Sequence, residues 1–282
     1  MAKSIVAVCQ MAVSDDKLEN FKQGKLLVCE SKRRGAVMTF LPEACDFVAS
    51  NSPELAEFIS SDTSVSSWYC ELARSEKIWI SLGGIHRKCA GDDQSKCRVS
   101  HVIINDVGEI TSVYDKCHLF SVDIPGKITL KETDRCVPGS AITDVTETPI
   151  GRVASLICYD VRFPQMSCEL RRRGAEILTY PSAFTVPTGH AHWHALLRSR
   201  AIETQCYVVA AALTGKHGTR SFYGHSLVVD PWGTVLADAG DEVGVSTASV
   251  DLGYMQTIRE NMPIDLHTRW SLYSDSKTRN EK

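Results

Sequence analysis

The chain has 282 residues, of which 43% are hydrophobic and 23% are charged, so it resembles a globular protein rather than a disordered, collagen-like or coiled-coil chain. The formal net charge of −3 leaves no basic surplus to neutralise phosphates, and we expect no nucleic-acid partner. The longest apolar run is the eight residues Cys206–Leu213, whereas a membrane-spanning helix needs about 20, so we expect no membrane partner.

The first predicted element is a strand near the N-terminus. Ile5–Cys9 is apolar and follows Met1-Ala2-Lys3 directly, without the cleavage site of a secretory signal or the arginines of a transit peptide. The 11 cysteines are odd in number and include no C-x-x-C pair, which argues against a disulfide scaffold, a zinc ribbon and a redox pair. We therefore expect a cytoplasmic protein with reduced cysteines.

Further along the chain, short apolar runs alternate with segments of helical periodicity. Candidate buried strands, rich in Val, Ile and Leu, are Ile5–Gln10, Val37–Leu41, Ile78–Leu82, Val153–Cys158, Ile177–Tyr180 and Cys206–Leu213. The first candidate helix is capped by Asp15 or Asp16, ends near Gly35 and carries Leu18, Phe21 and Val28 on one face; the others are Trp68–Lys77, Gln165–Arg173 and Trp193–Gln205. This alternation predicts a layered α/β fold.

The two halves of the chain resemble each other. Gly35–Ala44 lines up with Gly174–Ala183, because each follows two arginines and has Pro-x-Ala beginning seven residues after its glycine. Each half ends in a predicted hairpin with a turn near a glycine, Val102–Lys116 and Ser226–Asp238. We therefore predict two packed mixed sheets with helices on the outside.

Two segments lie outside this plan. Asp92–Cys97 is polar and predicts a surface loop, whereas His118–Ser140 is long and predicts a wall of the active site. No linker separates the two halves, so we predict a single domain over residues 1–272 and a polar tail over residues 273–282.

Three reactive side chains lie where strands are predicted to end: Glu43, Lys116 and Cys158. Ligands of α/β sheets bind beyond the carboxyl ends of strands. A thiol attacks a carbonyl as the thiolate, and a Glu base with a Lys cation could activate it. From the residues alone, a buried structural cysteine with a surface glutamate and lysine is the more common arrangement.

The sequences around these residues resemble the three motifs of the nitrilase superfamily, which are matched here by Leu41–Ala44, Tyr114–Phe120 and Ile157–Pro164. The resemblance extends from Val6 to about Leu272 and implies a four-layer αββα sandwich. It also implies hydrolysis of a carbon–nitrogen bond through a cysteine thioester, with Glu43, Lys116 and Cys158 as catalytic residues. By the same resemblance, Glu132 is a second glutamate that holds Lys116 or orients water.

Four further segments resemble the Nit branch of this superfamily: Ser81–Gly84, Ile124–Gly126, Glu203–Val208 and Asp230–Gly233. This resemblance implies a small-molecule amide substrate, with deaminated glutathione expected to yield 2-oxoglutarate and cysteinylglycine. An ω-amidase acting on 2-oxoglutaramate or 2-oxosuccinamate is the alternative. Some members of the branch precede a Fhit nucleotide-hydrolase domain, which we do not expect here.

The resemblance and the residues together give further expectations about binding. No Arg at a strand end is an obvious clamp, so we expect Tyr159, Ser182, Ala183, Phe184 and Thr185 to bind the substrate, together with N–H groups leading into the next helix. We expect no cofactor and no metal, because Lys116 can supply the positive charge. A homodimer or tetramer is expected, with an interface formed by Met166, Leu170, Met262, Pro263, Trp270, Leu272 and Tyr273.

Two features leave alternatives open. His190, His192 and His194 would share one side of a strand and could bind zinc there, but on the predicted helix only His190 and His194 share a face. His194 and Met166 stand where many relatives have Glu and Leu, so a catalytically weak interaction module is an alternative, as is a thiol-binding protein.

Asp160 and Arg162 are expected to form a structural pair after Cys158.

Overall fold

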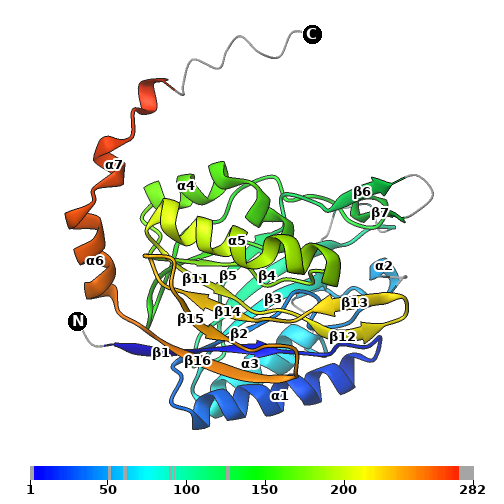
Figure 1. Ribbon diagram of the computed structural model, residues 1–282. Coiled ribbons are helices and arrows are strands. Elements are labelled where there is room, and N and C mark those ends of the chain that lie inside the picture. Colours follow the sequence, from blue (N-terminus) through cyan, green and yellow to red (C-terminus); the bar gives the residue numbers. More distant parts are fainter. Residues whose placement is uncertain are drawn as a thin grey trace.

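The computed structural model describes residues 3–49, 52–59, 62–88, 91, 93, 95–124 and 128–272. Two six-stranded sheets form its centre (Figure 1). The first sheet contains, in spatial order, β16 (Gly244–Val250), β1 (Ser4–Gln10), β2 (Met38–Leu41), β3 (Trp79–Arg87), β4 (Arg98–Ile104) and β5 (Ile110–Asp115). The second contains β15 (Val235–Asp238), β14 (Leu227–Val229), β11 (Tyr207–Ala210), β10 (Ile177–Thr179), β9 (Gly151–Ser155) and β8 (Thr146–Thr148).

The two sheets have the same pattern of pairing. In each, three consecutive strands of a β-α-β-α-β unit are parallel, and the strands outside them are antiparallel. β2 and β10 are the middle strands of these units, and they belong to the two segments that the sequence repeat aligns. The prediction of two similar halves, each a mixed sheet with a hairpin, is therefore confirmed.

Helices cover the outer face of each sheet, α1 (Lys17–Arg33) and α3 (Val65–Glu76) on the first and α4 (Pro164–Arg172) and α5 (Val186–Thr204) on the second (Figure 1). Successive residues of a strand point to opposite faces, so each strand serves two layers. In β1, Val6 and Val8 pack between the sheets, whereas Ala7 and Cys9 pack in the cluster that includes α1 and α3. Three apolar clusters thus join four layers, and the predicted αββα sandwich is confirmed.

The start of α1 follows its predicted cap, but its buried face differs from the prediction. The Asp16 side chain accepts hydrogen bonds from the N–H groups of Leu18 and Glu19. The buried residues of the helix are Asn20, Gly24, Leu27, Val28 and Ser31. Leu18 was expected on this face but is 49% exposed, because it lies about 200° around the helix from Asn20.

Several element boundaries also differ from the predictions. β9 ends at Ser155, and Cys158 instead begins the short helix η2 (Cys158–Arg162). α5 begins at Val186 rather than near Trp193. The long segment after His118 contains the hairpin of β6 (Ser121–Ile124) and β7 (Ile128–Lys131), followed by η1 (Glu132–Asp134).

The remaining elements lie at the edges of the sandwich: α2 (Ser52–Leu55), β12 (Thr214–His217), β13 (Arg220–Tyr223), α6 (Leu252–Asn261), α7 (Ile264–His267) and η3 (Trp270–Leu272). The hairpins β6–β7 and β12–β13 extend from one side of the molecule, and α6 and α7 project from the other (Figure 1). The expected tail, residues 273–282, and parts of the loop Asp92–Cys97 lie outside the described residues. Within the described ranges, no helix is both long and apolar enough to cross a bilayer.

Candidate active site

Cys158 lies just beyond the carboxyl end of β9, at the first position of η2. Its φ of 44° is in the left-handed region, which is uncommon for a residue with a side chain and often marks a functional site. Its N–H donates to the Pro181 carbonyl oxygen at 2.9 Å, which fixes this conformation. The side chain is largely buried, with only 9% of the residue exposed.

Glu43 lies just beyond the carboxyl end of β2, in the other sheet. Ala44 has a φ of 56°, and its N–H donates to the Gly84 carbonyl oxygen at 2.8 Å. A Cβ atom on Gly84 would lie 2.8 Å from Cα and Cγ of Glu43, so the close approach of β3 to Glu43 requires glycine. The backbone at both sheet ends is therefore shaped to present these two side chains.

Lys116 connects Glu43 with Glu132. Its Nζ donates to Glu43 Oε1 at 2.8 Å and lies 3.0 and 2.9 Å from the two carboxylate oxygens of Glu132. Each carboxylate also accepts a backbone hydrogen bond, Glu43 from the Ala183 N–H at 3.0 Å and Glu132 from the Phe120 N–H at 2.6 Å. The ammonium group is thus held between two oriented carboxylates.

Electrostatic interactions in this cluster determine which groups carry charge. Burial acts to lower the pKa of Lys116, but Glu43, Glu132 and Cys158 outweigh it and raise this pKa well above its ordinary value. Burial and the Glu43 carboxylate raise the pKa of the Cys158 thiol, whereas Lys116 and the Ala183 N–H act in the opposite direction. The lysine therefore stays protonated at neutral pH, and the resting cysteine is a thiol.

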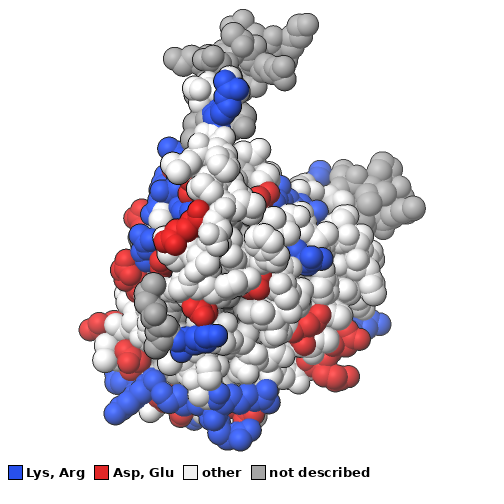
Figure 2. All heavy atoms as spheres, turned by 60° about the vertical axis from the view of Figure 1, so that its left-hand side comes forward, with Lys and Arg blue, Asp and Glu red and all other residues white. Residues whose placement is uncertain are grey.

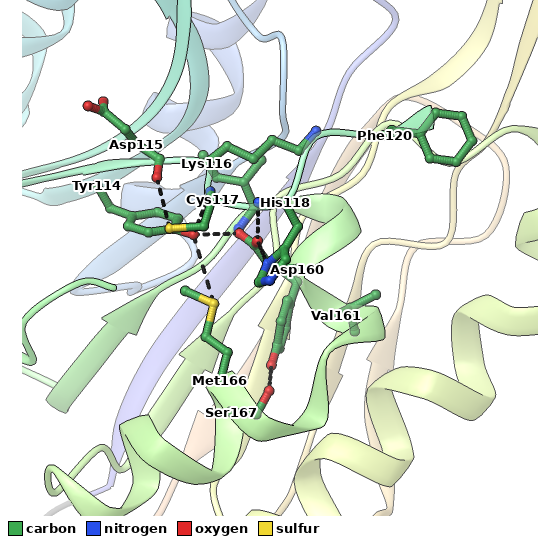
Figure 3. A network of polar contacts seen from close by, with 12 residues as sticks. Tyr114, Asp115, Lys116, Cys117, His118, Phe120, Asp160, Val161, Met166 and Ser167 are labelled. Atoms are coloured by element: carbon green, nitrogen blue, oxygen red, sulfur yellow. Dashed lines mark hydrogen bonds and ion pairs between the residues drawn. The ribbon is translucent and has the colours of Figure 1, made fainter. Parts of the chain in front are cut away.

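Asp160 anchors the turn that carries Cys158 (Figure 3). It is fully buried, and one of its oxygens accepts hydrogen bonds from Tyr114 Oη at 2.8 Å and from the Ile157 N–H at 2.9 Å. The other oxygen accepts from the His118 N–H at 3.2 Å and lies 2.7 Å from His118 Nδ1. Because Tyr114 and His118 flank Lys116, this carboxylate ties the lysine segment to the cysteine turn.

The expected pair between Asp160 and Arg162 is wrong. Arg162 Nη2 lies 3.2 Å from His192 Nδ1, and its guanidinium lies over the rings of Tyr159 and Phe184 at 5.8 and 5.5 Å. Asp160 is satisfied by donors within the buried turn and has no need of the arginine.

A cavity of about 160 Å³ opens onto this cluster. Glu43, Lys116, Glu132 and Cys158 line it, together with four of the five residues expected to bind substrate: Tyr159, Ala183, Phe184 and Thr185. Ser182, the fifth of these residues, is not among the described residues that line the cavity. It is fully buried, and its N–H and hydroxyl donate to the Ala211 and Tyr180 carbonyl oxygens, so its expected role is corrected to a structural one.

Three arginines that the sequence analysis did not expect to bind substrate also line the cavity: Arg135, Arg162 and Arg220. Arg135 follows η1, within the segment that was expected to form a wall. Arg220 begins β13, a short strand outside both main sheets. Burial lowers the pKa of Arg220, and the positive charge of Arg135 lowers it further. Both side chains line the cavity, so two positive charges lie there.

The chain belongs to the carbon-nitrogen hydrolase family, whose model matches residues 5–260. It is therefore a hydrolase of amide carbon–nitrogen bonds, as the three motifs predicted. The deaminated glutathione amidase of Rattus norvegicus is 47% identical over 274 residues, which are 95% of this chain and 83% of that protein. The NitFhit fusion protein of Caenorhabditis elegans is 44% identical over 274 residues, covering 96% of this chain and 62% of that protein.

Solved structures agree with the fold. The crystal structure of Caenorhabditis elegans NitFhit matches with a TM-score of 0.91 at 44% identity, covering 97% of this chain and 67% of that chain. Saccharomyces cerevisiae Nit3, described as a member of branch 10 of the nitrilase superfamily, matches with a TM-score of 0.83 at 28% identity. That match covers 93% of this chain and 95% of the Nit3 chain.

Proposed function

We propose that the protein hydrolyses deaminated glutathione to 2-oxoglutarate and cysteinylglycine through a thioester on Cys158. The observation that carries this proposal is the buried cluster in which Lys116 bridges Glu43 and Glu132 beside Cys158, at a cavity lined by arginines. The names of similar proteins from several animals suggest the substrate.

In the first half of the reaction, Glu43 takes the proton of the Cys158 thiol as Sγ attacks the amide carbonyl carbon. Lys116 stabilises the negative charge that develops on the carbonyl oxygen. The protonated Glu43 then gives its proton to the nitrogen of cysteinylglycine as the carbon–nitrogen bond breaks. The 2-oxoglutaryl group is left on Cys158 as a thioester.

In the second half, water attacks the thioester carbonyl while Glu43 takes its proton. Glu43 returns this proton to Cys158 Sγ as the carbon–sulfur bond breaks, so Cys158 is restored as a thiol and 2-oxoglutarate is released. Lys116 cannot act as the base, because its raised pKa keeps it protonated. Its role is to stabilise negative charge, and Glu132 holds it in place for that role.

Arg220 and Arg135 suit the carboxylate of the 2-oxoglutaryl group. A carboxylate bound between two nearby guanidinium groups would reduce their mutual repulsion and accept charge-assisted hydrogen bonds. The same carboxylate is present in 2-oxoglutaramate, so these arginines favour a short diacid acyl group and do not distinguish the two leaving groups.

The comparison that tests the substrate is kcat/KM for deaminated glutathione against 2-oxoglutaramate, measured at equal enzyme concentration. We expect the larger value for deaminated glutathione. A larger value for 2-oxoglutaramate would support the ω-amidase alternative and leave the mechanism intact. Failure to hydrolyse either compound or simple amides would favour the interaction module.

Replacing Arg220 with Gln should lower kcat/KM for deaminated glutathione about 10- to 100-fold, the range expected for losing a hydrogen bond to a charged group. An amide substrate without the carboxylate should be affected much less. Arg198→Gln is the matched control, because Arg198 lies on the exposed side of α5. An equal loss with both substrates would contradict the assignment of Arg220 to the carboxylate.

We also propose that the protein forms a homodimer or tetramer through its C-terminal helices. In the segment that follows α6, Met262, Leu266 and Leu272 are exposed, and Figure 2 shows a largely uncharged surface leading toward this projecting part. The expected contributions of Met166 and Leu170 are wrong, because both side chains are buried in the core. The side chains of Trp270 and Tyr273 lie outside the described part of the chain.

Light scattering of the full chain at micromolar concentration should give the mass of a dimer or a larger oligomer. Leu266→Lys should shift the population to smaller species, because Leu266 is 84% exposed and its replacement costs the monomer little. A monomer in the unmodified protein would contradict the oligomer.

The cytoplasm remains the compartment that we propose. The ten cysteines within the described ranges are all free, including Cys97 and Cys136, whose sulfur atoms lie only 3.8 Å apart. Free thiols at this separation are in keeping with a reducing compartment.

A further inference from the structure

A second cluster of chemically versatile side chains lies on the second half of the molecule. His194 is on α5, His225 is in the connection from β13 to β14, and Asp238 ends β15. His194 Nε2 lies 3.0 Å from Asp238 Oδ2, and His225 Nδ1 lies 2.9 and 3.1 Å from the two Asp238 oxygens. The described lining of the active-site cavity consists of other residues, so this is a separate site.

We propose that His194, His225 and Asp238 bind one Zn²⁺ ion. Two imidazole nitrogens and a carboxylate oxygen are ordinary zinc ligands at about 2.0–2.2 Å. Tetrahedral ligands at that distance are about 3.3 Å from one another. The separations of His194 and His225 from Asp238, 3.0 and 2.9 Å, therefore need to widen by only a few tenths of an ångström. One ligand atom from each of the three residues already lies within 4.8 Å of the others.

The groups around the three ligands support the same assignment. Histidines that bind a metal almost always donate their other ring N–H to a carboxylate, a carbonyl or water. His225 meets this condition, because its Nε2 lies 3.1 Å from Asp241 Oδ1 while its Nδ1 faces Asp238. Asp238 is oriented by the Gly240 N–H at 2.9 Å, and the His225 ring stacks on Tyr223 at 4.4 Å.

The site is accessible to an incoming ion. The side chains of His194, His225 and Asp238 are 35%, 23% and 32% exposed. Water can therefore deliver the ion and occupy the fourth coordination position. Of the three histidines considered from the sequence, only His194 takes part, because His190 packs against Tyr223 and His192 lies beside Arg162.

Zinc at this position would join α5, the connection from β13 to β14, and the end of β15. Trp193, next to His194, donates from Nε1 to the His225 carbonyl oxygen at 2.7 Å. The same indole packs at 4.8 Å against Phe184, which lines the cavity. The proposed ion stabilises this support and takes no part in the hydrolysis. The proposal therefore departs from the expectation of no metal but leaves the role of Lys116 in catalysis unchanged.

The test uses the metal-free full chain mixed with Zn²⁺ or Co²⁺ and then desalted. We expect one ion bound per chain and a rise in Tm of about 5 °C or more at saturating zinc. His194→Gln and Asp238→Asn should lose the ion and the rise in Tm. His190→Gln, one turn away on α5, should keep both.

Two further measurements keep the test decisive. Asp241 is 82% exposed, so Asp241→Asn should fold normally yet weaken zinc affinity about 10- to 100-fold. The Co²⁺ spectrum should show nitrogen and oxygen ligands without a thiolate charge-transfer band. No bound metal, equal binding by His194→Gln and the unmodified chain, or a thiolate band from a cysteine site would overturn the proposal.

Discussion

Replacing Cys158 with Ala should reduce amide hydrolysis at least about 10³-fold, because the proposed reaction has no path to products without the attacking sulfur. The variant should fold normally and still bind substrate, since the side chain loses only its sulfur at a position whose backbone is held by the Pro181 carbonyl oxygen. Activity with deaminated glutathione, measured by release of 2-oxoglutarate, provides the test.

Cys168→Ala is the matched control for this substitution. Cys168 lies on α4, and the cavity is lined by other residues in the part of the chain that the structure describes. It should therefore keep the activity of the unmodified protein. If the two variants were equally active, Cys158 would not be the nucleophile.

Glu43→Gln and Lys116→Met should each lower kcat about 10²- to 10⁴-fold, the range expected for a general base or a charge-stabilising group. The double variant should be little worse than either single variant, because both groups serve the same transition state. Steady-state rates of the three proteins, each checked for folding by its Tm, provide the measurement.

The control here is an ion pair of the same chemistry outside the cluster. Lys17 and Glu57 form a partly exposed pair, and Lys17→Met should leave kcat close to that of the unmodified protein. Retention of more than about a tenth of kcat by Glu43→Gln or Lys116→Met would contradict their essential roles.

The proximity of the catalytic candidates could be expected from the sequence because their positions follow from the topology. Glu43 follows β2, the middle strand of its unit, and Cys158 follows β9, which neighbours the middle strand of the other unit. Packing of the two sheets brings these strand ends together. Lys116 follows a hairpin strand of the first sheet and reaches the same point. The three motifs that resemble the nitrilase superfamily therefore carried most of the prediction, and the predicted strand ends agreed with them.

The remaining features depend on contacts between distant segments, which no local pattern reports. Arg220 reaches the cavity from the small hairpin β12–β13, and its sequence gives no sign of that neighbour. Met166 and Leu170 have the apolar character of an interface, but α4 uses them for the core. The meeting of His194 with Asp238 likewise depends on how α5 lies across the second sheet.

The central claim is a thioester on Cys158, and intact-protein mass spectrometry tests it most directly. The protein is mixed with deaminated glutathione, quenched in acid within one turnover and digested to locate the modified residue. We predict an added mass equal to one 2-oxoglutaryl group on Cys158, absent from Cys158→Ala. An acyl group on any other residue would contradict the account. So would release of 2-oxoglutarate without an acyl-enzyme on Cys158 in a variant slowed at the hydrolysis step.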